Sequence, residues 1–464
     1  MDGIVRIQEI EINNFKNIEK GVVSFQSYRC LNKDEKYKYA DILGLYGQNG
    51  SGKTSLIEAI DILKTMLSGR ELDKNIINLF KDNSQNTRFK YTFIIEVDSF
   101  KYKVIYDFEI QKNDKLEGLF EVIKESLKYT EVNIGKKMTL KTLISYDSYD
   151  KQGKILRPLN LLGKFEKEKQ YETALIVSKE FSKDHRTSFL FSKRTLNIVI
   201  DVLKRDSLVY SILSQLEQFA KMNLFVIRND YLGHINLNIN MPFSFMVRND
   251  NSLAKGTFAI SLFESSTINK EVYHLLEMVT KQINIVLEAL IPGLTLGIRK
   301  ISEDMTSDGS VGVKVELLSL RGDSKIPLKY ESEGIKKIIS ILSALIAMYN
   351  NEKVCLVIDE LDAGVFEFLL GEILSVLKEN SSGQLIFTSH NLRALEVLDK
   401  NDIMFTTTNS KRRYIRFKNI KNTNNLRDVY LREIFLGSQE EELYKRTKSY
   451  AINRAFRKAG TSNE

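Results

Sequence analysis

Apolar and polar positions along the chain predict a mixed α/β protein. An apolar run at Ile42–Tyr46 has the length of a buried strand, and from Thr54 to Ile60 the apolar residues recur at helical spacing. In the last third, strand-like runs at Val354–Ile358 and Gln384–Thr388 flank a helical pattern at Phe366–Leu377. Strands that alternate with helices in this way are typical of a sheet covered by helices.

Strict alternation of apolar and polar residues predicts antiparallel strands nearer the N-terminus. Val5–Phe25 is predicted to form two strands around a turn. Arg88–Val97 and Lys101–Ile110 form a predicted antiparallel pair, which a strand at residues 118–129 extends. We expect these last three strands to form a subdomain inserted between the first predicted helix and the rest of the fold.

Residues from about 130 to 300 give a weaker pattern. Apolar residues recur at helical intervals in Thr195–Met222 and Asn269–Leu290, so each stretch is predicted to be helical. Neither sustains a heptad repeat, which argues against long coiled-coil arms and favours a compact helical lobe. Beyond it, Ser310–Ser319 predicts a strand, Ile335–Tyr349 an apolar helix and Thr447–Glu464 a surface helix that frays.

A complete G-x-x-x-x-G-K-[ST] motif lies between the first strand and its helix. Glycines let backbone N–H groups curl around phosphates, and the N-terminus of the following helix adds positive potential. Lys53 is expected to reach the β- and γ-phosphates, and the Thr54 hydroxyl to bind Mg²⁺. The predicted nucleotide-binding loop comprises Gly47, Gln48, Asn49, Gly50, Ser51, Gly52, Lys53, Thr54 and Ser55.

Further polar residues follow the predicted strands near the C-terminus. Asp359 is expected to hold Mg²⁺ through its waters, and Glu360 to orient the attacking water. His390 ends the next strand, where a polar group can sense the γ-phosphate. Ser332 and Gly334 begin the apolar helix, where backbone N–H groups and a hydroxyl suit an anion, although an ordinary N-cap explains the same residues.

Together these motifs resemble the ABC-type ATPases of the SMC and RecF group. The resemblance rests on GQNGSGKT, SEG before an apolar helix, VCLVIDE, LDAG, TSH and the opening strand IEINNFKNI, and it covers residues 1–130 and 310–420. It implies a head-to-tail dimer with ATP sandwiched between two protomers. It also implies that Ser332 and Gly334 contact the γ-phosphate bound by the opposite protomer, that Asp362 communicates across the dimer, and that Lys16 contacts phosphate.

This sequence differs from the pattern of that group in several places, and the differences narrow the choice of subgroup. The signature is SEG rather than LSGGQ, and no glutamine is clearly placed as the Mg²⁺-linked lobe switch, Gln111 being only a guess. The middle insertion is too short and too unpatterned for long coiled coils, which favours the compact ATPases of bacterial anti-phage systems (PARIS-like, abortive-infection or OLD-like).

The chain is expected to divide into four parts. The ATPase head consists of two halves, 1–130 and 301–425, with a mostly helical insertion at 131–300 between them and a C-terminal extension at 426–464.

The composition of the chain bears on its partners, its cysteine chemistry and its location in the cell. The chain has 464 residues and a net charge of +8, from 68 basic and 60 acidic residues, which permits nucleic-acid contact without demonstrating it. The two cysteines, Cys30 and Cys355, lie far apart in the sequence, which argues against a disulfide framework and against a cysteine-based zinc site. Because neither a signal peptide nor an apolar run long enough to span a membrane occurs, a cytoplasmic location is expected.

The leading hypothesis is an ATP-binding and ATP-hydrolysing enzyme whose nucleotide-driven dimerisation, or higher oligomerisation, regulates a separate effector. The effector is expected to be a nuclease or toxin in anti-phage defence, because the sequence has a complete ATP site and no visible second active site. The alternative is a RecF-like DNA-maintenance ATPase that clamps duplex DNA directly. A non-hydrolysing scaffold is disfavoured by Glu360, and a transporter subunit by the signature and the missing membrane segment.

Overall fold

The computed structural model of this protein gives the arrangement of most of the chain. Cys30 and the predicted polar connection at residues 32–39 lie outside the described residues. The described residues are 3–25, 41–81, 84–97, 99–113, 119–132, 139–150, 154–167, 169–229, 233, 235, 237–249, 252–306, 309–418, 424–437 and 440–461.

A six-stranded sheet forms the centre of the molecule, in the order β19-β18-β3-β17-β16-β9. The strands from β18 to β9 run parallel, and β19 adds to the edge in antiparallel sense. Because parallel strands end at one edge, the loops after β3, β16 and β17 meet there. The bounds are β3 Asp41–Tyr46, β9 Leu224–Ile227, β16 Cys355–Ile358, β17 Gln384–Thr388, β18 Ile403–Thr406 and β19 Tyr414–Ile415.

A second, seven-stranded sheet is antiparallel throughout, in the order β2-β1-β4-β5-β6-β7-β8. The predicted α/β fold with an antiparallel β part is thereby confirmed. This sheet is larger than the predicted subdomain, because the N-terminal strands pair with β4 and two further strands follow β6. The bounds are β1 Ile4–Phe15, β2 Ile18–Ser24, β4 Asn86–Val97, β5 Phe100–Lys112, β6 Phe120–Glu131, β7 Lys141–Asp147 and β8 Leu156–Arg157.

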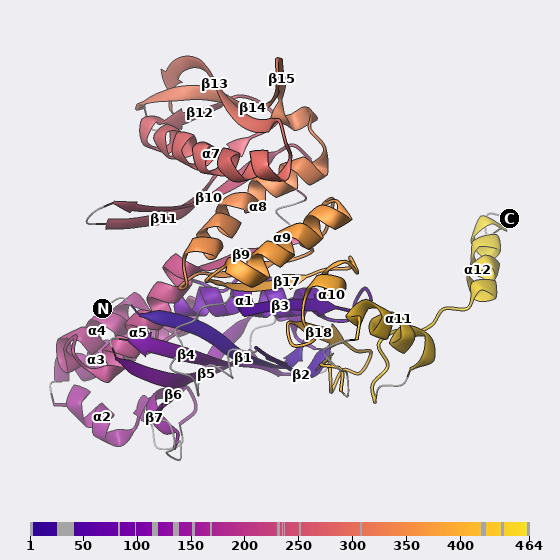
Figure 1. Ribbon diagram of the computed structural model, residues 1–464. Helices are drawn as coiled ribbons and strands as arrows, with labels where there is room; N and C mark the ends of the chain where they lie inside the picture. The colour runs from indigo at the N-terminus through magenta and orange to yellow at the C-terminus, as the bar shows by residue number, and fades with distance from the viewer. Residues whose placement is uncertain are drawn as a thin grey trace.

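Helix α1 (Lys53–Leu67) lies between these two sheets (Figure 1). Leu56, Ile60 and Leu63 are fully buried, and the Tyr91 hydroxyl donates a hydrogen bond of 2.7 Å to the carbonyl oxygen of Ala59. Most of this helix is buried because apolar residues cover most of its surface, while Thr54, Asp61, Lys64 and Thr65 stay open to solvent. The loop at its N-terminus is therefore held by a rigid element.

The range 131–300, predicted to be one compact helical lobe, is divided among three places. Four helices and a π-helical turn share the core of the antiparallel sheet, β9 enters the central sheet, and the remainder joins the upper lobe. The predicted helix at 195–222 is broken because Lys204 takes a φ of 66° and Ser207 caps a new helix. The first group comprises α2 Leu159–Phe165, α3 Lys169–Asp184, α4 Lys193–Leu203, α5 Leu208–Gln218 and the π turn Phe219–Asn223.

The upper lobe in Figure 1 stands on the long apolar helix α8 (Glu333–Asn350). It contains helix α7 (Lys270–Leu290) and an antiparallel sheet in the order β12-β14-β13, with β15 on β14. A hairpin of β10 and β11 packs against α8. The bounds are β10 Asn240–Asn249, β11 Ser252–Ser261, β12 Ser266–Asn269, β13 Leu294–Met305, β14 Val311–Arg321 and β15 Ser324–Pro327.

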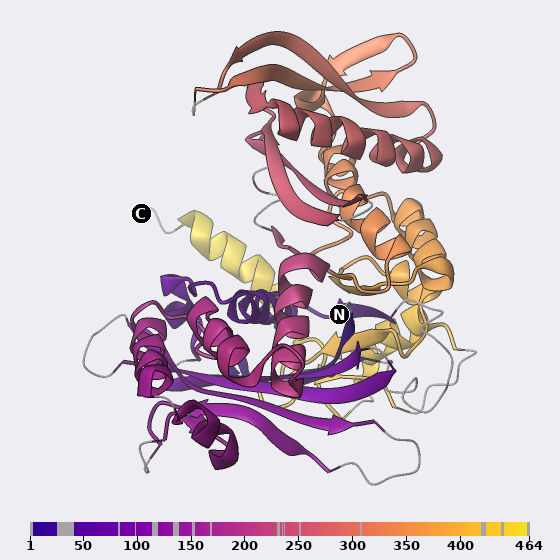
Figure 2. The same cartoon turned by 90° about the vertical axis from the view of Figure 1, so that its left-hand side faces the viewer.

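The last helix, α12, stands away from the body of the molecule in Figure 1, whereas in Figure 2 its lower end overlaps the body. It begins at Ser449 and ends at Thr461, within the predicted surface helix. The remaining elements are the 3₁₀ helices η2 Lys74–Leu79 and η4 Leu328–Tyr330, and the helices α9 Glu367–Asn380, α10 Ala394–Val397 and α11 Leu426–Leu436.

Among the described residues, no helix combines the length and the apolar character needed to cross a membrane.

Candidate nucleotide-binding site

The loop after β3 has the shape of a phosphate-binding cradle. Gly47 has a φ of 153°, and a Cβ at this position would lie 1.8 Å from Thr406 Oγ1. Only glycine fits there, because both the backbone conformation and the space exclude a side chain. Ser51 turns away from the cavity toward the same residue, Thr406, and its hydroxyl also donates a 2.6 Å hydrogen bond to the carbonyl oxygen of Gln48.

Lys53 lies over the loop that it follows. Its Nζ donates hydrogen bonds to the carbonyl oxygens of Gly47 at 2.8 Å and Gln48 at 3.1 Å. Burial lowers the pKa of Lys53, while Asp359 and Glu360 oppose that shift. The side chain therefore places a positive charge, partly removed from water, inside the cradle.

Two other segments support the cradle from outside. The Tyr414 hydroxyl on β19 donates a 2.7 Å hydrogen bond to the carbonyl oxygen of Gly52. Asn17, in the turn between β1 and β2, donates from Nδ2 to the carbonyl oxygen of Gly50. The loop is thus fixed by residues from both ends of the chain.

The acidic pair after β16 is held by a neighbouring threonine. Asp359 is only 2% exposed and accepts a 2.6 Å hydrogen bond from the hydroxyl of Thr388 on β17. The backbone N–H of Glu360 donates to the same Thr388 oxygen at 2.7 Å. Glu360 has a φ of 48°, an uncommon value for a residue with a side chain, and such conformations concentrate at functional sites.

Lys337 on α8 holds the turn at Glu360 in place. It is 3% exposed, and its Nζ donates a hydrogen bond to the carbonyl oxygen of Glu360. Burial lowers the pKa of Lys337 to about 8, although Asp362, Glu360 and Asp359 oppose the shift. Lys337 was not predicted from the sequence; its one signal is a lysine on the side of an apolar helix that faces the protein core.

Asp362 joins the loop after β16 to the loop after β17. Its Oδ2 accepts hydrogen bonds from the backbone N–H groups of His390 at 3.0 Å and Asn391 at 2.9 Å. Its Oδ1 is buried without a hydrogen-bond partner among the described residues. Burial, and then the charge of Lys53, lower the pKa of His390. Both effects favour the neutral imidazole, in which one nitrogen can donate a hydrogen bond.

These groups surround one cavity of about 440 Å³, a size typical of small-molecule sites. Lys16, predicted with the site, lines the cavity while its Nζ lies 2.5 Å from Glu58 Oε2. Asn17 and Thr388 line it too and were not predicted. The lining residues are Lys16, Asn17, Asn49, Gly50, Gly52, Lys53, Thr54, Ser55, Asp359, Glu360, Thr388 and His390.

Some predicted residues lie outside this lining. Gly47, Gln48 and Ser51 shape the loop rather than face the cavity, and Gln111 lies on β5 in register with Asn86 and Glu121. Its place in the antiparallel sheet does not support the guess that Gln111 is a lobe switch.

The predicted signature residues also lie elsewhere. Ser332 is exposed, and its hydroxyl accepts a 3.3 Å hydrogen bond from the N–H of Ile335 as the N-cap of α8. At Gly334 a Cβ would lie 1.9 Å from the carbonyl oxygen of Gly364, so the helix can approach the loop after Asp362 only with glycine there. Ser332, Gly334 and Asp362 do not line the cavity of their own chain.

A glycine-rich cradle with its lysine, an acidic pair and a histidine at one sheet edge define a P-loop nucleotide-binding domain. A family model for the AAA ATPase domain matches residues 6–394, and the chain belongs to this family. This finding confirms the sequence-based prediction of an ATPase-type domain. No curated protein matches the chain.

Solved structures give weaker likenesses, each covering 89% of this chain. The Smc head domain with an extended coiled coil bound to the C-terminal domain of ScpA, from Pyrococcus furiosus, is 14% identical, with a TM-score of 0.40 over 96% of that chain. The SMC head domain from Thermotoga maritima is 12% identical, with a TM-score of 0.35 over 99% of that chain. RecF-ATP, a recombination mediator, is 14% identical, with a TM-score of 0.36 over 100% of that chain. At these TM-scores the likenesses carry no weight for function.

Proposed function

We propose that this protein binds ATP with Mg²⁺ in the cavity and hydrolyses it. The observation that supports this most strongly is the convergence of Lys53, Asp359, Glu360 and His390 on one cavity from three separate strand ends. Each has a chemical task in phosphoryl transfer: a cation for the phosphates, a carboxylate for the metal, a carboxylate for water and a neutral donor.

The donor set fits a magnesium ion. Thr54 is exposed and Asp359 lines the same cavity, so the protein supplies a hydroxyl and a carboxylate, both hard oxygen ligands. When bound, Mg²⁺ neutralises charge on the β- and γ-phosphates. Lys53 exchanges its two loop carbonyls for phosphate oxygens, Glu360 accepts a hydrogen bond from the attacking water, and His390 donates one toward the γ-phosphate.

The same proposal includes a head-to-tail dimer of the SMC and RecF type. Ser332 and Gly334 do not line the cavity of their own chain, and Ser332 is exposed. A role for them at nucleotide therefore requires a second protomer. The exposed N-terminus of α8 suits this task, since it carries the positive end of a helix dipole.

We assign to this dimer the control of a separate effector, a nuclease or toxin, in anti-phage defence. The assignment rests on the motif resemblance and on a middle region whose longest described helix, α7, has 21 residues and is too short for a long coiled-coil arm. A cytoplasmic location goes with it as a prediction. The second candidate is a RecF-like clamp on duplex DNA, which the net charge of +8 permits. Such a clamp binds DNA with a steep salt dependence, because phosphate contacts release counterions.

A pull-down separates these candidates. Glu360→Gln, tagged and supplied with ATP, is recovered from a host that carries the neighbouring genes. A stoichiometric protein partner supports effector control, whereas nucleic acid without protein supports the clamp. Purified wild-type protein without measurable ATP hydrolysis, alone or with that partner and DNA, contradicts the enzymatic proposal itself.

A further inference from the structure

A second cavity, of about 660 Å³, lies apart from the nucleotide-binding cavity and shares no lining residue with it among the described residues. It is lined by the C-terminal half of α1, by β9, by the hairpin β10–β11 and by α8. These elements meet where the upper lobe stands on the rest of the molecule (Figure 1). The size of the second cavity is typical of sites that hold a whole small molecule.

Lys64 on α1 and Arg70, just beyond this helix, bring two positive charges to the second cavity. Within the described part of the chain, neither side chain forms a hydrogen bond or an ion pair. Burial lowers the pKa of Lys64, the nearby Asp61 opposes this shift, and the charge of Arg70 adds to it. The two cations are therefore close enough to repel each other, and neither lines the cavity proposed for ATP.

The carboxylates that line the second cavity do not balance these two charges. Asp61 Oδ2 lies 3.4 Å from Arg228 Nη1, and Glu71 forms an ion pair with Arg186. Because these four groups neutralise one another, the second cavity keeps an excess of positive charge.

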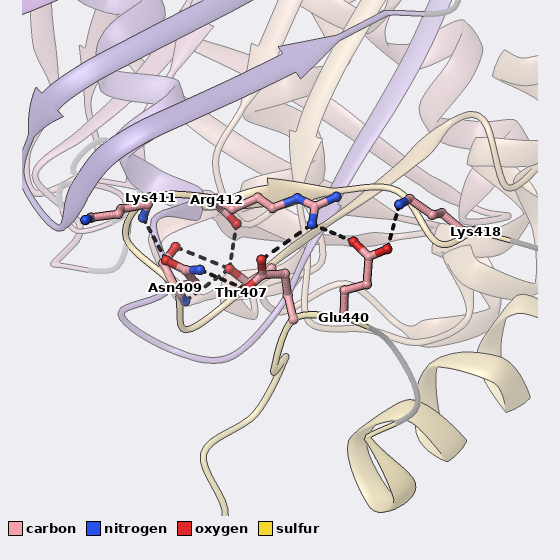
Figure 3. A network of polar contacts seen from close by, with 7 residues as sticks. Thr407, Asn409, Lys411, Arg412, Lys418 and Glu440 are labelled. Atoms are coloured by element: carbon pink, nitrogen blue, oxygen red, sulfur yellow. Dashed lines mark hydrogen bonds and ion pairs between the residues drawn. The ribbon is translucent and has the colours of Figure 1, made fainter.

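A cluster of charged residues near the C-terminus shows the contrast. Glu440 accepts hydrogen bonds from Arg412 at 2.7 Å and from Lys418 at 2.9 Å, so both cations have a partner in the same chain (Figure 3). No described residue gives Lys64 and Arg70 such a carboxylate. An anion from outside the chain is the group that can take its place.

The hairpin makes the second cavity suitable for an organic molecule rather than for a bare ion. Asn240, Pro242, Thr257 and Ala259 lie on one face of the hairpin, because alternate residues of a strand point to the same side. The side chains of Asn240 and Thr257 form no hydrogen bond with another described residue. Pro242, Ala259 and Phe258 add apolar surface. Apolar walls with a few polar groups are the usual lining of small-molecule sites.

We propose that the second cavity binds a phosphate monoester with an apolar organic body, its phosphate held by Lys64 and Arg70 and its body against the hairpin. A phosphate monoester carries a charge of about −1.5 to −2 at neutral pH, which matches two unpaired cations better than one carboxylate does. The guanidinium of Arg70 can bind two phosphate oxygens at once, and Lys64 adds a point charge. The ligand then contacts both the upper lobe and the helix that carries the nucleotide-binding loop.

Ligand-observed NMR with phenyl phosphate tests this site, since saturation transfer detects weak binding. The full chain carries Lys53→Ala and no nucleotide is added, so the nucleotide-binding loop lacks the ammonium group that would hold a phosphate. Phenyl phosphate is expected to bind, and phenol, which lacks the phosphate, is expected to give no signal. In this background Arg70→Glu should weaken the binding by on the order of tenfold or more, because repulsion replaces a charge-assisted hydrogen bond.

Two further variants accompany the charge reversal. Lys74→Glu reverses an exposed cation outside both cavities, so as the matched control it should leave phenyl phosphate binding unchanged. Ala259→Trp keeps the charge but places an indole in the second cavity, and it should abolish the binding. Ala259 is exposed, so this substitution does not disturb the core. Thermal unfolding checks that each variant is folded.

The outcomes separate the second cavity from the nucleotide-binding loop. If phenyl phosphate gives no signal, or if its binding survives both Arg70→Glu and Ala259→Trp, the inference is wrong. Binding to the wild-type chain that is lost in Lys53→Ala places the phosphate in the nucleotide-binding loop and also contradicts the inference. The experiment needs no ATP, so a failure of the proposed ATP hydrolysis leaves its result unaffected.

Discussion

The side chains of the cavity are held in place by the rest of the chain, whereas those of a second surface are exposed. We call this second surface, which includes Ser332 and Phe366, the signature surface. In the cavity, Lys53, Asp359 and Glu360 are held by hydrogen bonds from their own chain, and Asp359 is almost fully buried. At the signature surface, Ser332 is exposed and Phe366 presents most of its ring to solvent. The polar groups of the cavity are already held in place, whereas Ser332 and Phe366 face solvent.

This difference indicates what each region needs in order to act. The cavity can bind nucleotide without large rearrangement, since its polar groups already converge. In the proposed dimer, the signature surface gains its role when a second molecule covers it. Substitutions in the cavity are therefore expected to affect binding or chemistry within one chain, and substitutions at the surface to affect only the assembled dimer.

The largest effect is expected from Glu360→Gln. Loss of the group that orients water should lower the rate of ATP hydrolysis on the order of a thousandfold, within the range for general acid–base groups. ATP affinity should stay within about twofold, because the amide keeps the size of the side chain and Lys53 remains. Phosphate release under single turnover, together with nucleotide titration, checks both expectations. Glu379→Gln, at the exposed end of α9, is the matched control.

A smaller effect, and a different one, is expected from Lys53→Ala. Removal of the ammonium group should weaken ATP affinity by on the order of 100-fold, since charge-assisted hydrogen bonds to phosphate are lost. Isothermal titration measures the change. Lys64→Ala, three turns along the same helix and outside the cavity lining, should leave affinity unchanged. Equal losses in both variants would mean that α1, rather than the ammonium group, had been damaged.

Local chemistry in the sequence was enough to predict most of the residues that line the cavity, although not Asn17 and Thr388. The glycine-rich motif, Asp359, Glu360 and His390 each follow a strand-like run, and parallel pairing brings such strand ends together. Lys337 and Thr388 could not be predicted in the same way, since their roles depend on which backbone atoms of distant segments they meet. Strand β9 is only four residues long and pairs with β16, far along the chain, so periodicity gives little signal for it.

Lys337→Met tests the contact behind Glu360. Loss of the hydrogen bond to the Glu360 carbonyl should reduce hydrolysis about tenfold with ATP affinity unchanged, because the carboxylate is then less well positioned. The pKa of Lys337 in the folded protein is about 8, so its ammonium group loses its charge as pH rises through 8. The hydrogen bond to the Glu360 carbonyl then loses its charge assistance, and the wild-type rate of ATP hydrolysis should fall. The variant should lack this step. The unfolded chain keeps the lysine proton to higher pH, so wild-type stability should rise above pH 8, and this rise should also be absent in the variant. A variant with the wild-type pH profile would leave Lys337 with a packing role only.

The smallest expected signal comes from Ser332→Arg. It tests directly whether the cavity of one chain works with the signature surface of another. Ser332→Arg should bind ATP normally but block closure, because a bulky cation then occupies the exposed N-terminus of α8. Mixed in equal amounts, Ser332→Arg and Lys53→Ala chains should regain about a quarter of the wild-type ATPase activity. Random pairing makes half of the dimers mixed, and each mixed dimer holds one intact composite site. Recovery requires that the loop of one chain work with the signature of the other. If the mixture shows only the mean of the two inactive variants, Ser332 acts within its own chain and the contrast between cavity and surface does not reflect a shared site.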